Sequence, residues 1–592
     1  MCPLAKLLGP LACLLAVGCD IGSFFAEPAE TTSALGSQRL QRDPDTLIVG
    51  RPTDAIHLDP ARPSDNESVE VLEQIYDKLL HYEPGTNKIV PGLATRWEVT
   101  RNGREWTFWL REGVKFHDGT RFDADAVVFS LERQRDPRHP FHRPGEFSYW
   151  ENGFRNVEKV DKIDDFTVRI TIERSYAPFE ANLAMFPVAI VSPQAVAREG
   201  DDFTFRPVGT GAFRYGSWTR RQPLGADNRC GDSTCEPAEV CCMTRGPTPE
   251  DDNGSCMAAS ACQARIVLER NPDYWGGPPR LKRLVFEKIA DARQRLVALE
   301  SGAIDIAYSV LPEELQYVEL HPALTLHKVP ANNVAYLALN TGGGQPDPTR
   351  TLFDDVRVRR AINHAINKEP IVKLVYQGAA ITADGPLPPT QWGYHKPQAV
   401  YPYDPAKARQ LLEAARADGR FDPEHVYTLY VPSISRPYLP APERIGRVLQ
   451  ANLAEVGIRT QLIANDFPRH LAAVEGGVHD MCLHGWVGDN GDPDNFLYTL
   501  LDKDNTVPGL ARNVAFFSDE YVHGLLVQAQ ESDSREEREQ LYARAQEIIA
   551  AEAPWVPLAH TQVMVAARAD VGGVIINPQS QVSYRLVHRT GR

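Results

Sequence analysis

The chain has 592 residues, of which 43% are hydrophobic and 24% are charged, and its formal net charge is −15 at pH 7. This length suits several domains or two large lobes, and the composition excludes a mostly disordered or fibrous chain. The acidic balance argues against nucleic acid as the main partner, because phosphate binding needs clustered lysine and arginine.

The first 19 residues have the pattern of a bacterial lipoprotein signal peptide. One early lysine precedes an apolar run from Leu7 to Val17, which is too short to span a bilayer as a stable helix. The segment "LAVGC" ends at Cys19 and resembles a lipobox, whose cysteine becomes the lipidated first residue of the mature chain. We therefore expect a lipid anchor at Cys19 and a flexible tether over residues 20–43. The protein would then lie in the cell envelope, in the periplasm or on the outer face of the cytoplasmic membrane; simple secretion and a retained anchor are the alternatives.

The first half of the mature chain mixes helices with hairpins. After an apolar strand near Thr46, a helix is predicted from apolar residues at helical spacing, namely Val69, Leu72, Ile75 and Leu79. Asn102-Gly103 has alternating apolar and polar residues on both sides, which predicts a β-hairpin. The segment "DADAVVFSLERQ" predicts a helix, and "VDKIDDFTVRITIE" predicts a second hairpin.

Six cysteines lie close together in a Gly-, Pro- and Asp-rich stretch of this half: Cys230, Cys235, Cys241, Cys242, Cys256 and Cys262. In an exported protein such a cluster predicts three disulfides, although the sequence does not choose among the possible pairings. A zinc knuckle is the alternative, but adjacent cysteines suit a disulfide knot better than paired C-x-x-C ligands do. Because strand-like segments flank residues 224–263, we expect the cluster to be an insertion in a hairpin turn. Cys482 stands apart and is expected to be a buried free thiol.

The second half is richer in helix and predicts parallel strands. One helix is well delimited, with Asp404 as N-cap, Pro405 in the first turn and Gly419 at the end. The strand-like "YTLYVP", the helix-like "PERIGRVLQANLAEVG" and the strand-like "IRTQLIA" then follow in order. Strand–helix–strand order predicts an α/β lobe with parallel pairing.

The sequence lacks the motifs of the common enzyme classes. It contains no H-E-x-x-H zinc motif, no G-x-S-x-G nucleophile elbow and no phosphate-binding P-loop. His139 and His142 lie in a proline-rich stretch and are better explained as solvated loop residues than as metal ligands. We therefore expect a protein that is not an enzyme and that uses no cofactor and no metal. An envelope enzyme such as a peptidase is the alternative from another class.

Two charged residues of the second half stand beside aromatic residues after strand-like segments. Asp489 follows Trp486 in "GWVGDNGDPDN", and Arg436 precedes Tyr438 in "SISRPYLP". Because ligands of parallel α/β sheets bind at the carboxyl ends of strands, both loops are expected at one edge. A buried carboxylate needs a cation or several donors, and arginine holds a carboxylate bidentately. Such a set would suit a zwitterion of defined length. The loop's other two aspartates are more simply backbone caps: Asp492 and Asp494.

Several longer segments carry a family resemblance: "PGLATRWEVTRNGREWTFWLREGVKFHDG", "VGTGAFRYGSW", "NPDYWGG", "DDVRVRRAINHAINKEPIVKLVYQGAA" and "YDPAKARQLLEAA". They resemble the bacterial extracellular solute-binding proteins of the peptide/nickel class (family 5), the receptors of peptide-importing ABC transporters. The resemblance runs from about Thr46 to about Val587 and leaves out the cysteine insertion, which is not typical of the class. The segments "SRPYLP" and "GWVGDNGDPDN" together resemble its dipeptide-binding branch. In that branch cysteines follow "DPDNF", and this chain has none there.

The resemblance implies a two-lobed α/β fold of the periplasmic-binding-protein type, whose lobes close over a ligand by a hinge motion. Residues 44–339 would form the first lobe, with an extra subdomain at about 84–208 and the cysteine insertion. Residues 340–559 would form the second lobe, and residues 560–592 would return to the first.

The resemblance also implies roles for the charged pair. Asp489 would bind the α-amino group of a short peptide and Arg436 its α-carboxylate, with Trp486 and Tyr438 as pocket walls. We therefore expect a monomeric, lipid-anchored receptor that captures short peptides, dipeptides first, and delivers them to an ABC permease in the membrane. The same fold could instead serve glutathione, haem, a nickel chelate, or a longer or antimicrobial peptide. An adhesion or scaffold role carried by the cysteine insertion is a third hypothesis.

Overall fold

The computed structural model describes residues 44–590 except 63–64, 101, 223, 225–227, 232 and 343–352. The expected signal peptide, Cys19 and the tether of residues 20–43 lie outside the described residues. None of the helices in the described part is long and apolar enough to cross a bilayer.

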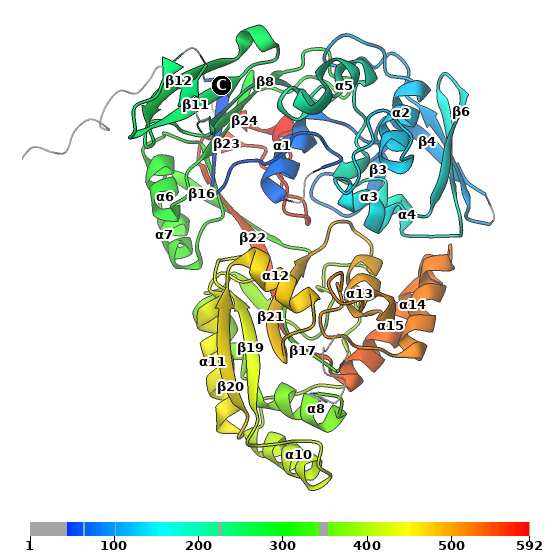
Figure 1. Ribbon diagram of the computed structural model, residues 1–592, viewed down its shortest axis with the longest axis vertical. Helices are drawn as coiled ribbons and strands as arrows, with labels where there is room; N and C mark the ends of the chain where they lie inside the picture. The colour runs from blue at the N-terminus through cyan, green and yellow to red at the C-terminus, as the bar shows by residue number, and fades with distance from the viewer. Residues whose placement is uncertain are drawn as a thin grey trace, which may run out of the picture. The chain divides into compact units, whose positions relative to one another are not determined.

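A 14-stranded sheet runs through the described chain (Figure 1). Its order is β12-β11-β8-β13-β14-β1-β15-β22-β17-β21-β19-β20, and β16 and β18 also pair with β22. The strands are β1 (Thr46–Arg51), β8 (Phe213–Gln222), β11 (Glu239–Arg245), β12 (Asn253–Ala258), β13 (Arg265–Arg270), β14 (Arg283–Lys288), β15 (Ile306–Tyr308), β16 (Leu324–Pro330), β17 (Asn333–Leu339), β18 (Ala380–Thr382), β19 (Val426–Pro432), β20 (Arg459–Asn465), β21 (Met481–Val487) and β22 (Trp555–Arg568).

The long strand β22 joins the two halves of this sheet. Its first part, up to Thr561, pairs with β17 and β18, and its later part pairs with β15 and β16. We call the body built on β1, β8 and β11 to β16 the first lobe, and the body built on β17 to β21 the second lobe. The fold is therefore two-lobed and α/β, as expected. The division at residues 44–339, 340–559 and 560–592 stays a prediction.

The second lobe has the expected parallel pairs. β19 runs parallel to β20 and to β21, while β17 is antiparallel to β21 and to β22. The predicted cap at Asp404 is confirmed, since its carboxylate accepts the Lys407 N–H at 2.9 Å at the start of α10. The helices of this lobe are α8 (Val356–Ala365), α9 (Lys368–Val375), α10 (Pro405–Ala417), α11 (Pro442–Glu455), α12 (Phe467–Glu475), α13 (Asp494–Leu501), α14 (Glu520–Glu531) and α15 (Arg535–Glu552).

A separate four-stranded antiparallel sheet, in the order β4-β5-β7-β6, extends the first lobe. Both predicted hairpins are confirmed in it: β4 (Ala94–Val99) pairs with β5 (Glu105–Leu110), and β6 (Val157–Asp164) pairs with β7 (Thr167–Ile172). Gly103 has φ +68° in the first turn, a conformation that glycine adopts without strain. The remaining helices and short strands here are α1 (Asn66–Ile75), α2 (Ala124–Arg135), α3 (Ser148–Gly153), α4 (Phe179–Asn182), α5 (Pro193–Glu199), α6 (Ala292–Glu300), α7 (Leu315–Leu320), β2 (Leu80–Tyr82), β3 (Ile89–Pro91), β23 (Val571–Gly572) and β24 (His588–Arg589).

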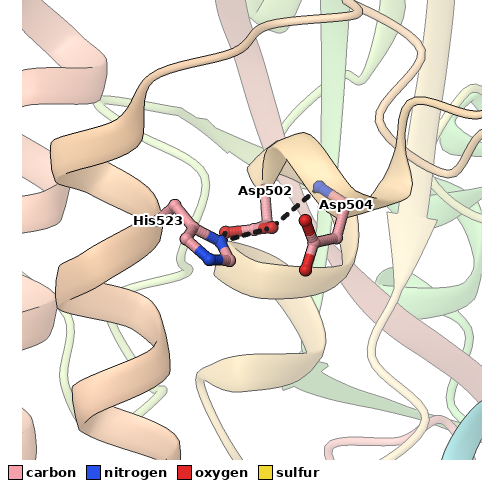
Figure 2. A group of neighbouring side chains, drawn as sticks. All are labelled: Asp502, Asp504 and His523. Carbon is pink, nitrogen blue, oxygen red and sulfur yellow. Dashed lines mark hydrogen bonds and ion pairs between the residues drawn. The ribbon is translucent and has the colours of Figure 1, made fainter.

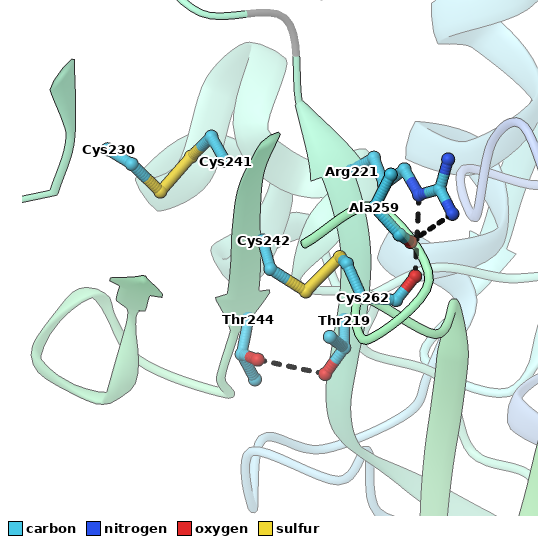
Figure 3. Close-up of a disulfide and its surroundings, with 8 residues drawn as sticks. All are labelled: Thr219, Arg221, Cys230, Cys241, Cys242, Thr244, Ala259 and Cys262. Carbon is cyan, nitrogen blue, oxygen red and sulfur yellow. Dashed lines mark hydrogen bonds between the residues drawn. A yellow bond between two sulfur atoms is a disulfide. The ribbon is translucent and has the colours of Figure 1, made fainter. Parts of the chain in front are cut away.

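The cysteine module, residues 224–263, lies between the paired strands β8 and β13, as the sequence predicted. It is not a plain loop: it adds β11 and β12 to the edge of the large sheet and forms a small hairpin of β9 (Arg229–Cys230) and β10 (Ser233–Thr234). Three disulfides hold it, Cys230–Cys241, Cys235–Cys256 and Cys242–Cys262. Figure 3 shows the last of these beside the Thr219–Thr244 hydrogen bond of 2.8 Å between β8 and β11. Since all six sulfurs are paired, no thiolate of the module is left for zinc.

Cys482 on β21 is a free thiol with no exposed surface, as expected. Burial raises the pKa of this thiol, so it stays protonated. It packs with apolar residues of the second lobe, including Tyr336 and Phe496. Its contribution is therefore to the core.

Candidate ligand-binding site

Asp489 and Arg436 follow neighbouring parallel strands at the same edge of the sheet. Arg436 comes after β19 and Asp489 after β21, and these strands pair in parallel with Leu429 opposite Met481. Both loops therefore leave the sheet at the carboxyl ends of their strands, which is where ligands of parallel sheets bind. The sequence predicted this placement.

The two motifs are packed together through Tyr438. Its ring lies against Gly485 of β21, so that a Cβ added to Gly485 would come within 2.3 Å of the ring. The Tyr438 carbonyl accepts a hydrogen bond from the Tyr376 hydroxyl at 2.9 Å, and only 5% of the residue is exposed. The glycine before Trp486 thus provides the space in which the loop of Arg436 rests on β21. Tyr438 is mostly a packing residue.

Asp489 is half-buried, and its direct partners are neutral. Its Oδ1 accepts a hydrogen bond from the Tyr149 hydroxyl at 3.2 Å, and its backbone N–H donates to the Asn495 side chain at 3.0 Å. Across the residues that the structure describes, no lysine or arginine forms an ion pair with it. Desolvation raises the pKa of the Asp489 carboxyl to about 6, while hydrogen bonds and the more distant Arg512 oppose the rise.

Trp486 is oriented by the same asparagine. Its indole N–H donates to Asn495 Oδ1 at 2.9 Å, so one amide oxygen fixes both the ring and the backbone at Asp489. Trp486 is half-buried and packs against the core of the second lobe. The aromatic ring and the carboxylate of this motif are thereby held by one residue, which the sequence did not single out.

Arg436 is half-buried and presents a guanidinium without an acidic partner. The guanidinium carbon lies 3.9 Å from the centre of the Phe467 ring at the start of α12, a stacked arrangement that suits arginine. Its backbone pairs with Leu439 through two hydrogen bonds of 2.9 Å. Within the described ranges, no carboxylate lies within ion-pair distance of it, and its Nε is buried without a hydrogen-bond partner. A carboxylate from a ligand would satisfy this charge.

The loop that carries Asp489 also binds Asn332, which directly precedes β17, and two residues of the first lobe. The Gly488 N–H donates to the Asn332 carbonyl at 2.7 Å, and the Asn332 side chain donates back to the Asn490 carbonyl at 3.1 Å. The Asn490 side chain donates to Asn182 Oδ1 at 2.6 Å, and the Gly491 N–H donates to the Tyr82 hydroxyl at 3.0 Å. Hydrogen bonds with Asn332, Asn182 and Tyr82 therefore fix the position of this loop.

Asp492 makes a buried ion pair that the sequence did not reveal. Both of its oxygens accept from Arg538 on α15, at 2.7 and 2.8 Å, and both residues are more than 90% buried. Asp492 Oδ1 also accepts the Asp494 N–H at 3.0 Å, so the expected backbone cap forms as well. The ion pair ties the site loop to α15.

The expectation that Asp494 is a backbone cap is wrong. Its carboxylate accepts from the Tyr176 hydroxyl at 3.0 Å and from the Gln530 amide at 2.9 Å. Burial, followed by the charge of Asp492, raises the pKa of Asp494 to about 7. The reason is that α13 begins at this residue inside the protein, where the carboxylate is buried between side chains of both lobes.

One group of side chains has the composition of a metal site but a simpler explanation. Figure 2 shows Asp502, Asp504 and His523, whose ligand atoms lie within 4.8 Å of one another. Asp502 Oδ1 accepts the Asp504 N–H at 2.9 Å and caps the 3₁₀ turn Lys503–Asn505, and His523 Nδ1 lies 3.0 Å from Asp502 Oδ2. These contacts fasten α14 to the end of α13.

Comparison with known proteins identifies the family. The family described as "Bacterial extracellular solute-binding proteins, family 5 Middle" matches residues 88–224 and 259–507, which is more than half of the chain and leaves out most of the cysteine module. The chain belongs to this family. Members of the family are binding proteins rather than enzymes, and they are extracellular or periplasmic.

Three relatives illustrate the range of ligands in the family. The dipeptide-binding protein of Escherichia coli (strain K12) is 31% identical over 519 residues, which are 85% of this chain and 87% of that protein. Heme-binding protein A of Haemophilus influenzae is 33% identical over 521 residues, 86% of this chain and 85% of that protein. The solved structure of the periplasmic binding protein DppA from Helicobacter pylori, in complex with peptide STSA, has a TM-score of 0.72 at 31% identity and covers 92% of this chain and 98% of its own. These matches show the two-lobed fold and a solute receptor.

Proposed function

We propose that this family 5 protein is the receptor of an ABC importer for short peptides, with dipeptides as the preferred ligands. Asp489 would bind the peptide α-amino group and Arg436 its α-carboxylate. The observation that carries the proposal is the pair itself: opposite charges at one sheet edge, neither of which has an oppositely charged side chain within ion-pair distance among the described residues. A zwitterionic ligand supplies both missing charges.

The remaining parts of the proposal concern delivery. A monomer anchored through lipid at Cys19 would capture the peptide between its lobes and present it to a membrane permease. Trp486 and Tyr438 would wall the pocket. Side chains of the peptide would lie in hydrated space, which permits low sequence specificity.

Calorimetry on the ligand-stripped protein tests the proposal. Ala-Ala should bind, and the same dipeptide with an acetylated amine or an amidated carboxylate should bind far more weakly, because each block removes one of the two ion pairs. Equal affinity for free and blocked peptides would contradict the assignment of Asp489 and Arg436. No heat with Ala-Ala, from a folded and stripped protein, would contradict dipeptide binding.

A second candidate ligand is haem, because the heme-binding relative is as similar to this chain as the dipeptide-binding one. Titration with hemin, followed in the visible absorption spectrum, separates the two candidates. A saturable spectral change with no response to Ala-Ala would favour haem, whereas competition between the two would indicate a shared pocket.

A further inference from the structure

Two tyrosines of the first lobe donate hydrogen bonds to two carboxylates that follow β21 in the second lobe. Tyr149, on α3, donates to Asp489 Oδ1 at 3.2 Å, and Tyr176 donates to Asp494 Oδ2 at 3.0 Å. The Tyr149 ring is itself held edge-on by Phe186, with ring centres 4.8 Å apart. Each bond joins a residue of the first lobe to a residue of the second, so it exists only when the two lobes lie together.

The two bonds differ in what else the carboxylate touches. Asp494 is shared with the Gln530 amide and lies beside the ion-paired Asp492, so its surroundings are complete without a ligand. Asp489 has the Tyr149 hydroxyl and Asn495 as its partners, and no ion pair within the described residues. A carboxylate has about four lone-pair positions, so Asp489 keeps acceptor capacity for a cation.

A hydroxyl donates a stronger hydrogen bond to an ionised carboxylate than to a neutral carboxyl group. Desolvation disfavours the ionised form of Asp489 and raises its pKa to about 6. Above that pH the carboxylate is ionised and accepts the Tyr149 hydroxyl in the stronger bond, and an ammonium placed on Asp489 extends the ionised state to lower pH. Recognition of the ammonium and the bond from the first lobe therefore depend on the same ionised carboxylate.

We propose that Tyr149 is a positioning residue that couples recognition of the ligand's ammonium group at Asp489 to closure of the lobes. This inference rests on the proposed function of Asp489. Tyr149 does not bind the ligand in this scheme; it holds Asp489 Oδ1 from the opposite lobe and so turns the rest of the carboxylate toward the cation. Tyr176 provides a bond of the same kind between the same lobes, but its acceptor is not the ligand's partner.

Two other charged groups of the described residues act on this contact. Arg512, from the loop before α14, lowers the pKa of Asp489 through its charge, and Asp65, at the N-cap of α1, acts on Tyr149. Asn495 on α13 and Phe186 are neutral. The pH response of ligand binding should therefore follow Asp489, with Arg512 as a constant opposing charge.

The test compares Tyr149→Phe with the matched control Tyr176→Phe in the full-length, ligand-stripped protein. Ala-Ala affinity is measured by calorimetry between pH 5 and pH 8. For Tyr149→Phe we expect affinity at pH 7.5 to fall by about five- to tenfold, the usual worth of one hydrogen bond. We also expect the pH below which binding weakens to move upward, because Asp489 loses a donor to its ionised form. Tyr176→Phe should leave that pH midpoint where it is in the unmodified protein.

Three results would overturn the inference. Tyr149→Phe could bind Ala-Ala with unchanged affinity and midpoint, or Tyr176→Phe could shift the midpoint as much as Tyr149→Phe does. In either case the unmodified protein still binds Ala-Ala, so the proposed function stands and only the role of Tyr149 fails. If the unmodified protein does not bind Ala-Ala, the proposed function fails, and this inference fails with it.

Discussion

Replacing Asp489 by asparagine should stabilise the unliganded protein while it removes ligand affinity. The pKa of the Asp489 carboxyl rises from 3.8 to about 6 on folding, and two units correspond to about 3 kcal/mol. Because the side chain is only half-buried, solvent screening reduces this to about 1–2 kcal/mol. A raised pKa penalises the ionised form, so the penalty is absent below about pH 4 and complete above about pH 6. Asparagine carries no charge and avoids it.

The effect on binding has the opposite sign. A ligand ammonium that has lost its carboxylate partner is left in a desolvated site, which typically costs about 2–5 kcal/mol. This corresponds to an affinity for Ala-Ala that is lower by about 30-fold to several thousand-fold. One substitution thus separates stability from function, as expected where a charge is held ready for a ligand.

Urea unfolding and calorimetry measure the two effects. Asp489→Asn should unfold at higher urea than the unmodified protein at pH 7.5, and the difference should vanish near pH 4. Asp533→Asn is the control, since Asp533 is an exposed carboxylate of the second lobe. A variant that is less stable at pH 7.5 and binds Ala-Ala normally would refute the reasoning on both counts.

Three further outcomes follow from the contacts described above. Arg436→Ala should weaken Ala-Ala binding by about 2–5 kcal/mol in calorimetry. It should change the weak binding of the amidated dipeptide little, because that ligand has no carboxylate. Equal losses for both ligands would show that Arg436 does not bind the carboxylate. Arg538→Met should lower the free energy of unfolding in urea by about 3–5 kcal/mol, since Asp492 is left as an unpaired buried charge. The Arg538→Met/Asp492→Leu double variant should recover much of this loss. An Arg538→Met variant as stable as the unmodified protein would contradict the role of the ion pair. Reduction of the three disulfides should make the cysteine module susceptible to limited proteolysis. Ala-Ala affinity should stay within about twofold, because the module lies at the far edge of the sheet from β19 and β21. Loss of binding on reduction would contradict this separation.

Local signals in the sequence were enough to predict the local structure. Asn102-Gly103 predicted its hairpin because a tight turn needs residues that tolerate a positive φ, and Asp404 predicted its helix start because a carboxylate can accept an N–H of the first turn. The strand order predicted that Arg436 and Asp489 share one sheet edge. These features depend on neighbours within a few residues or on the handedness of strand–helix–strand units.

Contacts between distant segments could not be predicted in this way. Asp492 and Asp494 look alike in sequence, yet one pairs with Arg538 and the other accepts from Tyr176. Arg538 is 46 residues from Asp492, and Tyr176 is 318 residues from Asp494, so no spacing rule connects either pair. Which partner each carboxylate has depends on which lobe covers it. Tyr149 was missed for the same reason: its chemistry matters only because the fold brings α3 to the loop after β21.

The shared strand β22 can complete the sheet only after its partner strands have been made. It lies in the middle of the strand order, between β15 and β17, although it follows all of its partner strands in the chain. Its partners lie far back in the sequence, as in the pair Ile306 and Ala567, so the fold has many long-range contacts that form late and slowly. A chain that ends before Trp555 would leave unpaired strand edges on β15, β16, β17 and β18 at once, and such edges promote aggregation. Loss of the C-terminal segment would therefore disable both lobes together.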